Sequence, residues 1–153
     1  MEVAAAAAQP AAGEGATAAG CDLVHVPGFK DRLHPRFLAR AFADEEVKES
    51  LQRFDAGESL AARWAAKEAA FKAFRQLARA FAAPVRGLGI FRDYVVATEA
   101  ASRVPLLRLS GRPAALLEQL RAKGASVSLG LSLTHDGDYA AAFVVVNVRM
   151  ARP

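Results

Sequence analysis

The sequence has little capacity for cysteine chemistry, because Cys21 is the single cysteine among 153 residues. One thiol forms no internal disulfide and cannot build a cysteine-based metal site, so the chain fits a reducing compartment. No apolar run reaches the roughly 18 residues that a membrane-spanning helix needs. The longest such run, residues 139–146, has the length of a strand. These absences predict a soluble, cytoplasmic protein that binds no membrane.

Lysine and arginine are missing from residues 1–19, in which ten positions are alanine and the charged residues are Glu2 and Glu14. A secretory signal begins with basic residues and a transit peptide is rich in arginine, so neither is indicated. A segment with so few large side chains has little to bury. We expect a disordered tail at residues 1–19, one domain at residues 20–149 and a short C-terminal tail at residues 150–153.

The remaining composition is that of a globular domain, with 53% hydrophobic and 24% charged residues. A chain of this length can bury one substantial core. The formal net charge of +4 is modest. It favours an acidic partner or a phosphate-bearing ligand without separating the two.

Helical and strand patterns are partly segregated along the chain. Residues 20–26 alternate like a short strand, helices are indicated from about His34 and again from Asp44, and a long helix should run from a Ser59 N-cap to about Phe81. Strand patterns follow at residues 94–97, 105–109, 127–134 and 139–148, with a helix after Gly111 and a hairpin turn at Asp136-Gly137. This order predicts an α+β fold, in which an antiparallel sheet packs on the long central helix.

The long helix carries charges within its bulky apolar face. Lys67 and Glu68 fall among Leu60, Trp64 and Phe71, whereas the opposite face is almost entirely alanine. A structural explanation is an ion pair between Glu68 and Lys72, one turn apart, worth a few tenths of a kcal/mol. The alternative is that these charges hold an ion, because buried charge is costly unless it is paired.

Asp22 at the first strand and Glu68 on the long helix could together hold Mg²⁺. This ion takes one or two protein carboxylates and completes its coordination with water and phosphate oxygens. Lys67, Lys72 and Arg63 would lie beside such a phosphate, as phosphoryl transfer requires cations on the developing charge. Each residue also has an ordinary structural explanation. Asp22 could cap a turn, and a lone histidine such as His135 could simply close the hairpin.

Three motifs in order resemble a known family. They are Gly20-x-Asp22, then Arg63-Trp64-x-x-Lys67-Glu68-Ala69-x-x-Lys72, which fits the pattern R-[FW]-x-x-K-E-A-x-x-K, and then Ser132-Leu133-Thr134-His135-Asp136. The combination resembles the small, trimeric class of 4'-phosphopantetheinyl transferases, the holo-acyl-carrier-protein synthases. The resemblance covers roughly residues 20–147.

This resemblance implies transfer of the phosphopantetheine arm of coenzyme A to a serine of an acyl carrier protein, with release of adenosine 3',5'-bisphosphate. Asp22 and Glu68 would bind Mg²⁺, and Glu68 would take the serine proton, directly or through a bound water. Lys72, grouped with Asp22 and Glu68 as catalytic, would neutralise pyrophosphate charge together with Lys67. Arg63, Ser132 and His135 would contact coenzyme A.

The same resemblance implies a homotrimer with sites between subunits, so that residues 132–135 would serve the Asp22–Glu68 pair of a neighbour. The basic residues Arg32, Arg36 and Arg40 would meet the acidic recognition helix of the carrier protein, and no nucleic acid is expected as a partner. Fatty-acid and polyketide synthesis both remain open as pathways.

Three segments depart from the family pattern, among them the glycine-rich turn at Gly87–Gly89, which is less regular than in the family. His25 replaces the acid that usually follows the metal-binding aspartate by three residues, and Ser102-Arg103-Val104 replaces the usual Gly-Lys before Pro105. The departures put an auxiliary ligand and the adenine-side contacts in doubt. Another Mg²⁺-dependent phosphoryl-transfer enzyme, or a non-catalytic basic module that binds an acidic partner, remains an alternative.

Overall fold

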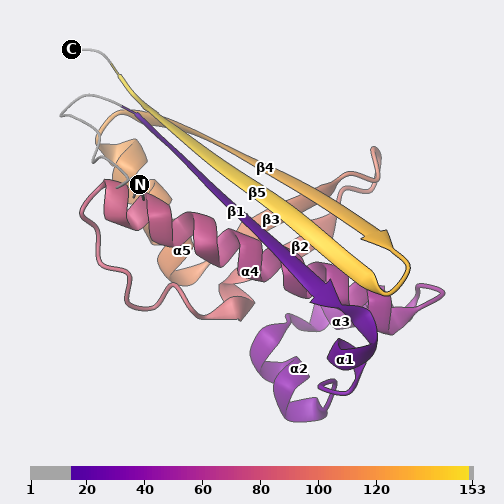
Figure 1. Cartoon of the computed structure of the whole chain (residues 1–153). Coiled ribbons are helices and arrows are strands. Elements are labelled where there is room, and N and C mark those ends of the chain that lie inside the picture. The colour runs from indigo at the N-terminus through magenta and orange to yellow at the C-terminus, as the bar shows by residue number, and fades with distance from the viewer. Residues whose placement is uncertain (1–14, 152–153) are drawn as a thin grey trace, which may run out of the picture.

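A computed structural model describes residues 15–151, and Figure 1 shows its elements. In chain order they are β1 (Ala16–His25), α1 (Val26–Lys30), α2 (Pro35–Ala41), α3 (Asp44–Leu51), α4 (Ala56–Ala80), the 3₁₀ turn η1 (Phe91–Asp93), β2 (Tyr94–Thr98), β3 (Pro105–Leu109), α5 (Gly111–Ala122), β4 (Ala125–Asp136) and β5 (Tyr139–Met150). None of the helices within residues 15–151 is long and apolar enough to cross a membrane.

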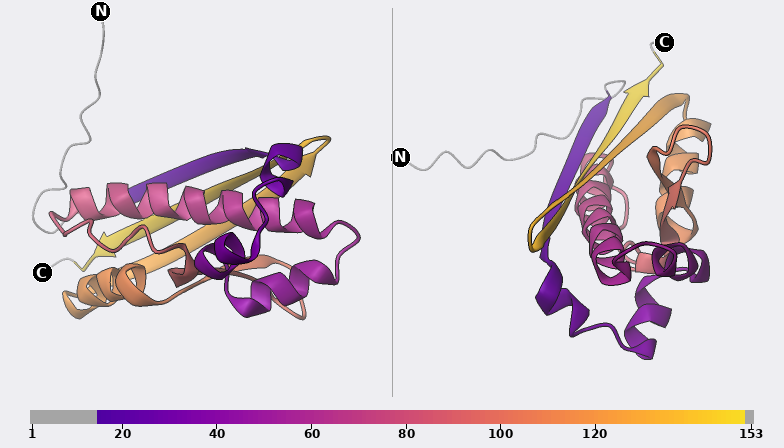
Figure 2. Two further views of the ribbon diagram at one scale, coloured as in Figure 1. Left: turned by 90° about the horizontal axis from the view of Figure 1, so that it is seen from below. Right: turned by 90° about the vertical axis from the view of Figure 1, so that its right-hand side faces the viewer.

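Two antiparallel sheets enclose the long helix. β1, β5 and β4 form one sheet in that order, and β2 pairs with β3 in the other. Helix α4 runs beneath the three-stranded sheet, with α1, α2 and α3 gathered near its N-terminal half (Figures 1 and 2). The predicted α+β architecture with an antiparallel sheet on a central helix is confirmed.

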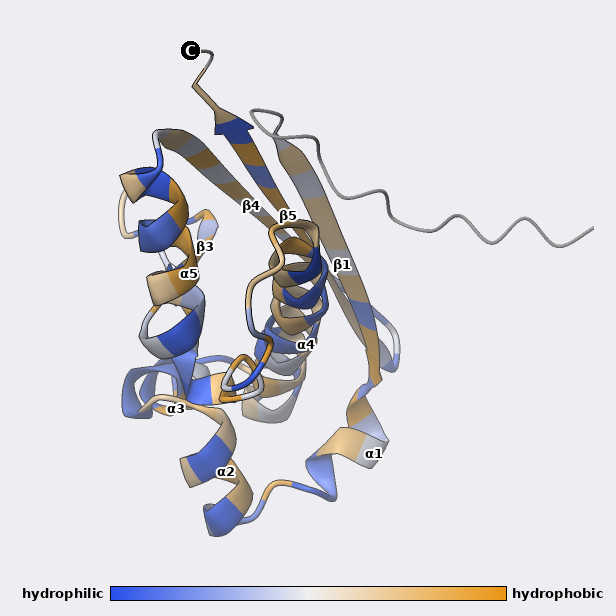
Figure 3. Cartoon of the chain, turned by 90° about the vertical axis from the view of Figure 1, so that its left-hand side faces the viewer, coloured by the Kyte–Doolittle hydropathy of each residue, from blue (hydrophilic) through white to orange (hydrophobic). Residues whose placement is uncertain are grey.

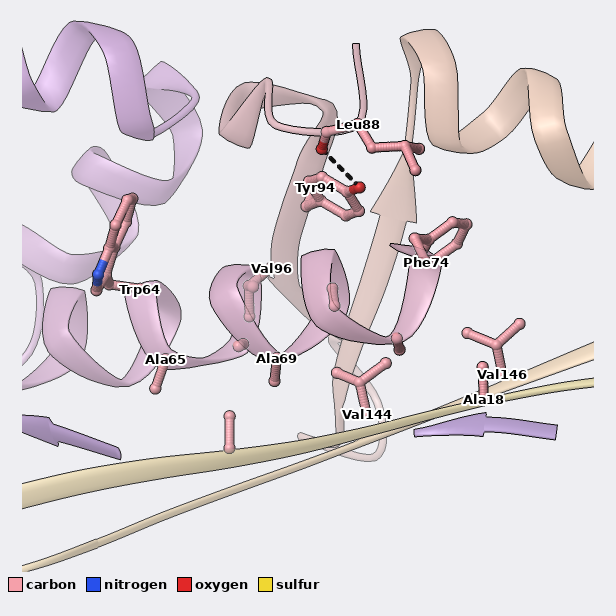
Figure 4. Packing of buried hydrophobic residues seen from close by; sticks show 14 of the residues in the cluster. Ala18, Trp64, Ala65, Ala69, Phe74, Leu88, Tyr94, Val96, Val144 and Val146 are labelled. Atoms are coloured by element: carbon pink, nitrogen blue, oxygen red, sulfur yellow. Dashed lines mark hydrogen bonds between the residues drawn. The ribbon is translucent and has the colours of Figure 1, made fainter. Parts of the chain in front are cut away.

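The alanine-rich face of α4 packs directly against the sheet. Ala65 and Ala69 are fully buried and point toward the strands in Figure 4. At Gly20 of β1 the two backbones nearly touch, since an added Cβ would lie 2.0 Å from the carbonyl oxygen of Ala69. Only glycine permits this approach, and it brings β1 to within side-chain reach of the helix at Ala69, the residue that follows Glu68.

The bulky face of α4 packs on the β2 side of the molecule. Trp64 and Phe74 are buried there, and Phe74 meets the ring of Tyr94 edge to face at 5.7 Å between centroids. The Tyr94 hydroxyl donates to the carbonyl of Leu88 over 2.8 Å (Figure 4), so its polar end is satisfied within the core.

Element boundaries differ from the sequence-based expectation at several places, and α1 was not expected. Residues 16–19 were expected in the tail, but they belong to β1 and pair with β5, because small side chains suit a strand packed closely on a helix. Residues 1–14 lie outside the described range. Met150 likewise ends β5. Helix α4 begins at Ala56, since the Asp55 carboxylate accepts from the Glu58 N–H over 2.9 Å and replaces Ser59 as the N-cap.

Candidate active site

Asp22 and Lys72 meet where β1 crosses α4. Asp22 lies on the inward face of the strand, opposite Ala142 of β5. The Lys72 ammonium donates to the Asp22 carboxylate over 2.7 Å and to the Cys21 carbonyl over 2.9 Å. The bond to Asp22 raises the pKa of Lys72, so this lysine stays charged beside the carboxylate.

Glu68 lies one turn before Lys72 and is partly buried. Burial raises the pKa of Glu68 first, and the nearby Asp22 charge raises it further, whereas the charges of Lys72 and Arg32 oppose the rise. The two carboxylates, one on the strand and one on the helix, are therefore close enough for their charges to interact. A cation between them would relieve their repulsion.

The donor set of this pair suits Mg²⁺. Carboxylate oxygens are the ligands this ion prefers, and it commonly uses only one or two of them. Within residues 15–151 no cluster of three or more His, Cys, Asp or Glu side chains could hold a metal. Water and a substrate phosphate would have to supply the other ligands of an ion held by Asp22 and Glu68.

A hollow of about 590 Å³ lies beside Asp22 and Lys72. Ser132 and Thr134 of β4 line it together with these two residues. Ser132 therefore shares a cavity with Asp22 of its own chain.

Arg63 and His135 line a second hollow, of about 680 Å³, near the N-terminal end of α4. We call it the α4 hollow. Arg63 is only 6% exposed, and its guanidinium is bound by the Glu49 carboxylate at 2.8 Å and by the Ser59 hydroxyl at 2.6 Å. Its Nε is buried without a hydrogen-bond partner. A buried unpaired donor is costly and indicates a missing acceptor.

His135 is exposed, and its Nδ1 lies 3.3 Å from the Glu58 carboxylate. The structure thus brings together Arg63 and His135, which are 72 residues apart in sequence (135 − 63). The α4 hollow also contains Arg53 and Arg103, which the sequence analysis did not select. The sequence offered one signal for Arg103, namely that Ser102-Arg103-Val104 stands before Pro105 where the family usually has Gly-Lys.

Lys67 is the predicted site residue that the structure corrects. Its side chain is fully buried, and its ammonium lies 2.8 Å from the Glu46 carboxylate. It also donates to the carbonyls of Phe91, over 3.0 Å, and Tyr94. Burial lowers the pKa of Lys67, and the Glu46 charge opposes that effect. The expectation that Lys67 contacts pyrophosphate is wrong for this chain, because the N–H donors of its ammonium already bond to Glu46, Phe91 and Tyr94 inside the core.

The basic residues around α1 and α2 occupy two different environments. Arg36 and Arg40 are exposed on α2, whose hydrophilic bands are visible in Figure 3. Arg32 lies 5.1 Å from the ring centroid of Phe37 and 5.8 Å from that of Trp64, which places it beside α4 one turn before Glu68. Arg32 is thus nearest to the carboxylate pair.

His25 has a structural role at the end of β1. Its Nδ1 accepts from the Gly28 N–H over 3.3 Å and so caps α1. The position that departs from the family pattern therefore caps a helix in this chain.

Comparison with known proteins identifies the family of this arrangement. Residues 18–144 match the model of the 4'-phosphopantetheinyl transferase superfamily. The chain is 37% identical over 135 residues to the holo-[acyl-carrier-protein] synthases of Mycobacterium bovis and Mycobacterium tuberculosis, covering 86% of this chain and 97% of each relative.

Solved structures agree with the sequence match. The ACPS-CoA complex of Chronobacterium ammoniagenes superposes with a TM-score of 0.70 at 35% identity, over 90% of this chain and 99% of that one. The acyl carrier protein synthase of Mycobacterium tuberculosis gives a TM-score of 0.61 at 34% identity, over 84% and 95% of the respective chains. The chain belongs to the 4'-phosphopantetheinyl transferase superfamily, and within it to the holo-[acyl-carrier-protein] synthase type.

Proposed function

We propose that this protein is a holo-[acyl-carrier-protein] synthase, which moves the 4'-phosphopantetheine arm of coenzyme A onto a serine of an acyl carrier protein. The observation that carries the proposal is the meeting of Asp22, Glu68 and Lys72 in a chain of this family. The serine oxygen forms a bond to the phosphorus that bears the pantetheine arm, the bond from that phosphorus to the bridging oxygen breaks, and adenosine 3',5'-bisphosphate leaves.

Asp22 and Glu68 would hold Mg²⁺, and the bound ion would neutralise charge on the pyrophosphate. Lys72 places a further cation where the leaving phosphate gains charge. Glu68 would accept the serine proton, directly or through a bound water, because it lies beside Asp22 and Lys72 where the serine must approach the phosphorus. The proton then passes from Glu68 to water once the products have left.

The α4 hollow would hold the nucleotide half of coenzyme A. Arg63 offers its unpaired Nε, and His135 lies at the same hollow. The start of α4 also lines the hollow, and the N-terminus of a helix favours an anion. Ser132, beside Asp22 and Lys72, would contact the part of coenzyme A that reaches the carboxylate pair.

The carrier protein would dock against α1 and α2. Arg36 and Arg40 present exposed positive charge there, and Arg32 links that surface to the carboxylate pair. An acidic helix of the carrier would match this surface in charge, and its serine would then approach Glu68.

A homotrimer would cover the outward face of the three-stranded sheet. Large apolar side chains stand exposed there: Leu23 at 64%, Phe143 at 49% and Tyr139 at 49%. A contiguous exposed apolar face favours association with another protein surface, and a second copy of this chain is the proposed occupant. We place the assembled enzyme in the cytoplasm, in keeping with its single cysteine.

The test is the intact mass of a purified apo acyl carrier protein after incubation with this protein, coenzyme A and Mg²⁺. A gain of one phosphopantetheine that a chelator abolishes is expected. Asp22→Ala and Glu68→Ala should each abolish the gain while the protein stays folded. Glu118→Gln, which changes an exposed carboxylate on α5, is the matched control and should transfer normally. A wild-type protein that is folded but modifies no carrier would refute the proposal.

A further inference from the structure

Basic side chains follow one line along the C-terminal half of α4. Three of them come after Glu68 at spacings of four, three and four residues, namely Lys72, Arg75 and Arg79. These spacings place the three side chains on the same face of the helix as Glu68, and all three are exposed. Glu68 and Arg79 are roughly 16 Å apart along the helix axis. We call Arg75 and Arg79 the α4 ridge, because Lys72 already belongs to the active site.

Negative charge is missing from the sequence around the α4 ridge. Residues 69–92 contain five lysine or arginine residues and no aspartate or glutamate. Within residues 15–151 the ion pairs involve other basic residues, and none joins Arg75 or Arg79 to a carboxylate. A solvated helix face usually carries charges of both signs. A face with one sign only favours a negatively charged partner.

Aromatic and apolar side chains lie beside the α4 ridge. The Arg75 guanidinium lies 5.6 Å from the ring centroid of Phe71, a cation–π contact that orients it. Phe71 meets the ring of Phe91 edge to face at 5.7 Å between centroids. Ile90, which precedes Phe91, is 55% exposed. Arginine, aromatic and apolar side chains gathered at one surface are typical of protein–protein interfaces, so this surface fits an acidic protein rather than a small anion.

We infer that the α4 ridge is a second docking surface for the acyl carrier protein, on the other side of Glu68 from the surface on α1 and α2. The inference rests on the proposed function and deepens it. Helices α1 and α2 lie near the N-terminal half of α4 (Figure 1), whereas the α4 ridge lies on its C-terminal half. The turn from Glu68 to Lys72, where the carrier serine would react, is between them. A carrier would therefore be held on both sides of its serine.

The size of a carrier allows it to contact both surfaces. A small folded domain is about 30 Å across, so it extends about 15 Å to either side of a serine at its centre. Arg75 lies roughly 10 Å of helix rise beyond Glu68, and Arg79 roughly 16 Å. Carboxylates on the far side of the serine would thus meet two guanidiniums, which bind carboxylates in a bidentate geometry. The enzyme should then select carriers that are acidic on both sides of the serine.

The test measures kcat/KM for a purified apo acyl carrier protein at saturating coenzyme A. It compares the wild type with a neutral double variant, Arg75→Gln with Arg79→Gln, and a reversed double variant, Arg75→Glu with Arg79→Glu. At about 50 mM salt the neutral variant should lose about threefold to tenfold, and the reversed variant about tenfold to hundredfold. At about 500 mM salt both losses should shrink to about twofold, because salt screens exposed charges.

Controls separate docking from folding and from chemistry. The KM for coenzyme A, and kcat at saturating carrier, should stay within about twofold of wild type in both double variants. Arg121→Gln, at an exposed arginine in the last turn of α5, is the charge-matched control and should keep full kcat/KM. A glutamate in the last turn of α4 opposes the helix dipole. Thermal unfolding is therefore measured for each variant, and the neutral variant decides the test if the reversed variant unfolds.

The outcomes separate the docking surface from the proposed function. An unchanged kcat/KM for carrier at low salt would overturn the α4 ridge as a docking surface and leave the transferase intact. A raised KM for coenzyme A, with carrier binding unchanged, would assign these arginines to the nucleotide and would also overturn it.

A wild type that modifies no carrier would instead count against the proposed function. Calorimetric titration of the enzyme with apo carrier protein, without coenzyme A, would then decide the docking surface. Binding that weakens at least about threefold in the neutral variant would support the α4 ridge. Equal binding by both proteins, or no binding by the wild type, would overturn it.

Discussion

Replacing Lys67 with methionine should destabilise the fold rather than weaken binding of coenzyme A. Both charged groups of the Lys67–Glu46 pair are fully buried, 2.8 Å apart. Glu46 further accepts from the Ala43 N–H over 2.8 Å and from the Val96 N–H over 3.0 Å. The pair therefore joins α3, α4 and β2, and methionine preserves the stem of Lys67 while removing its charge.

Removing one partner of a buried ion pair leaves the other charge without compensation, at a cost of about 3–5 kcal/mol. The total stability of a domain is typically about 5–15 kcal/mol, so this is a large fraction of it. For a chain of this size the loss corresponds to a fall in Tm of about 6–20 °C. Glu46→Gln combined with Lys67→Met should lose less than the sum of the single changes, by roughly 0.5–3 kcal/mol.

The assay is thermal and urea unfolding at one fixed protein concentration, together with steady-state kinetics. Lys72→Met provides the contrast, since its ion pair with Asp22 is partly exposed and such pairs contribute about 0–1 kcal/mol. Lys67→Met should thus lose stability, whereas Lys72→Met should lose transfer with little change in Tm. A Lys67→Met protein with wild-type Tm and a raised KM for coenzyme A would refute the reasoning and restore the direct role that the sequence indicated.

Three further predictions follow from the fold and the proposed surfaces. Gly20→Ala should lower the free energy of unfolding by about 1–3 kcal/mol or more, because the new methyl group meets backbone of α4; thermal unfolding measures it, and an unchanged Tm would contradict the close approach. Phe143→Asp should dissociate the proposed trimer into monomers in sedimentation velocity, since a charge would be buried in an apolar contact; a wild type that is already monomeric would rule out the contact. Charge reversal of Arg36 or Arg40 to Glu should raise the KM for carrier protein at least about tenfold with kcat for the bound complex little changed, and an unaltered KM would remove α2 from the docking surface.

Local pattern was sufficient for most of the secondary structure. Alternation predicted the strand around Leu131, an apolar run predicted the strand around Val144, and Asp136-Gly137 predicted the hairpin between them. The start of α4 was misplaced because Ser59 and Asp55 are both good N-caps, and the choice between them depends on Lys30, which is remote in sequence. The beginning of β1 was missed because alanine-rich sequence has weak strand preference, and its pairing with β5 provides the stability.

The sequence by itself identified Asp22 and Glu68 as the carboxylate pair. Local features of the chain were enough for this, namely the Asp22 motif and the spacing of Lys67, Glu68 and Lys72. Tertiary structure decided which of these charges face a ligand. Lys67 and Glu68 are adjacent in sequence, yet one turns toward Glu46 in the core and the other toward Asp22 at the surface. Neighbouring residues on a helix point about 100° apart, so the elements packed around α4 determine whether each charge is structural or available for chemistry.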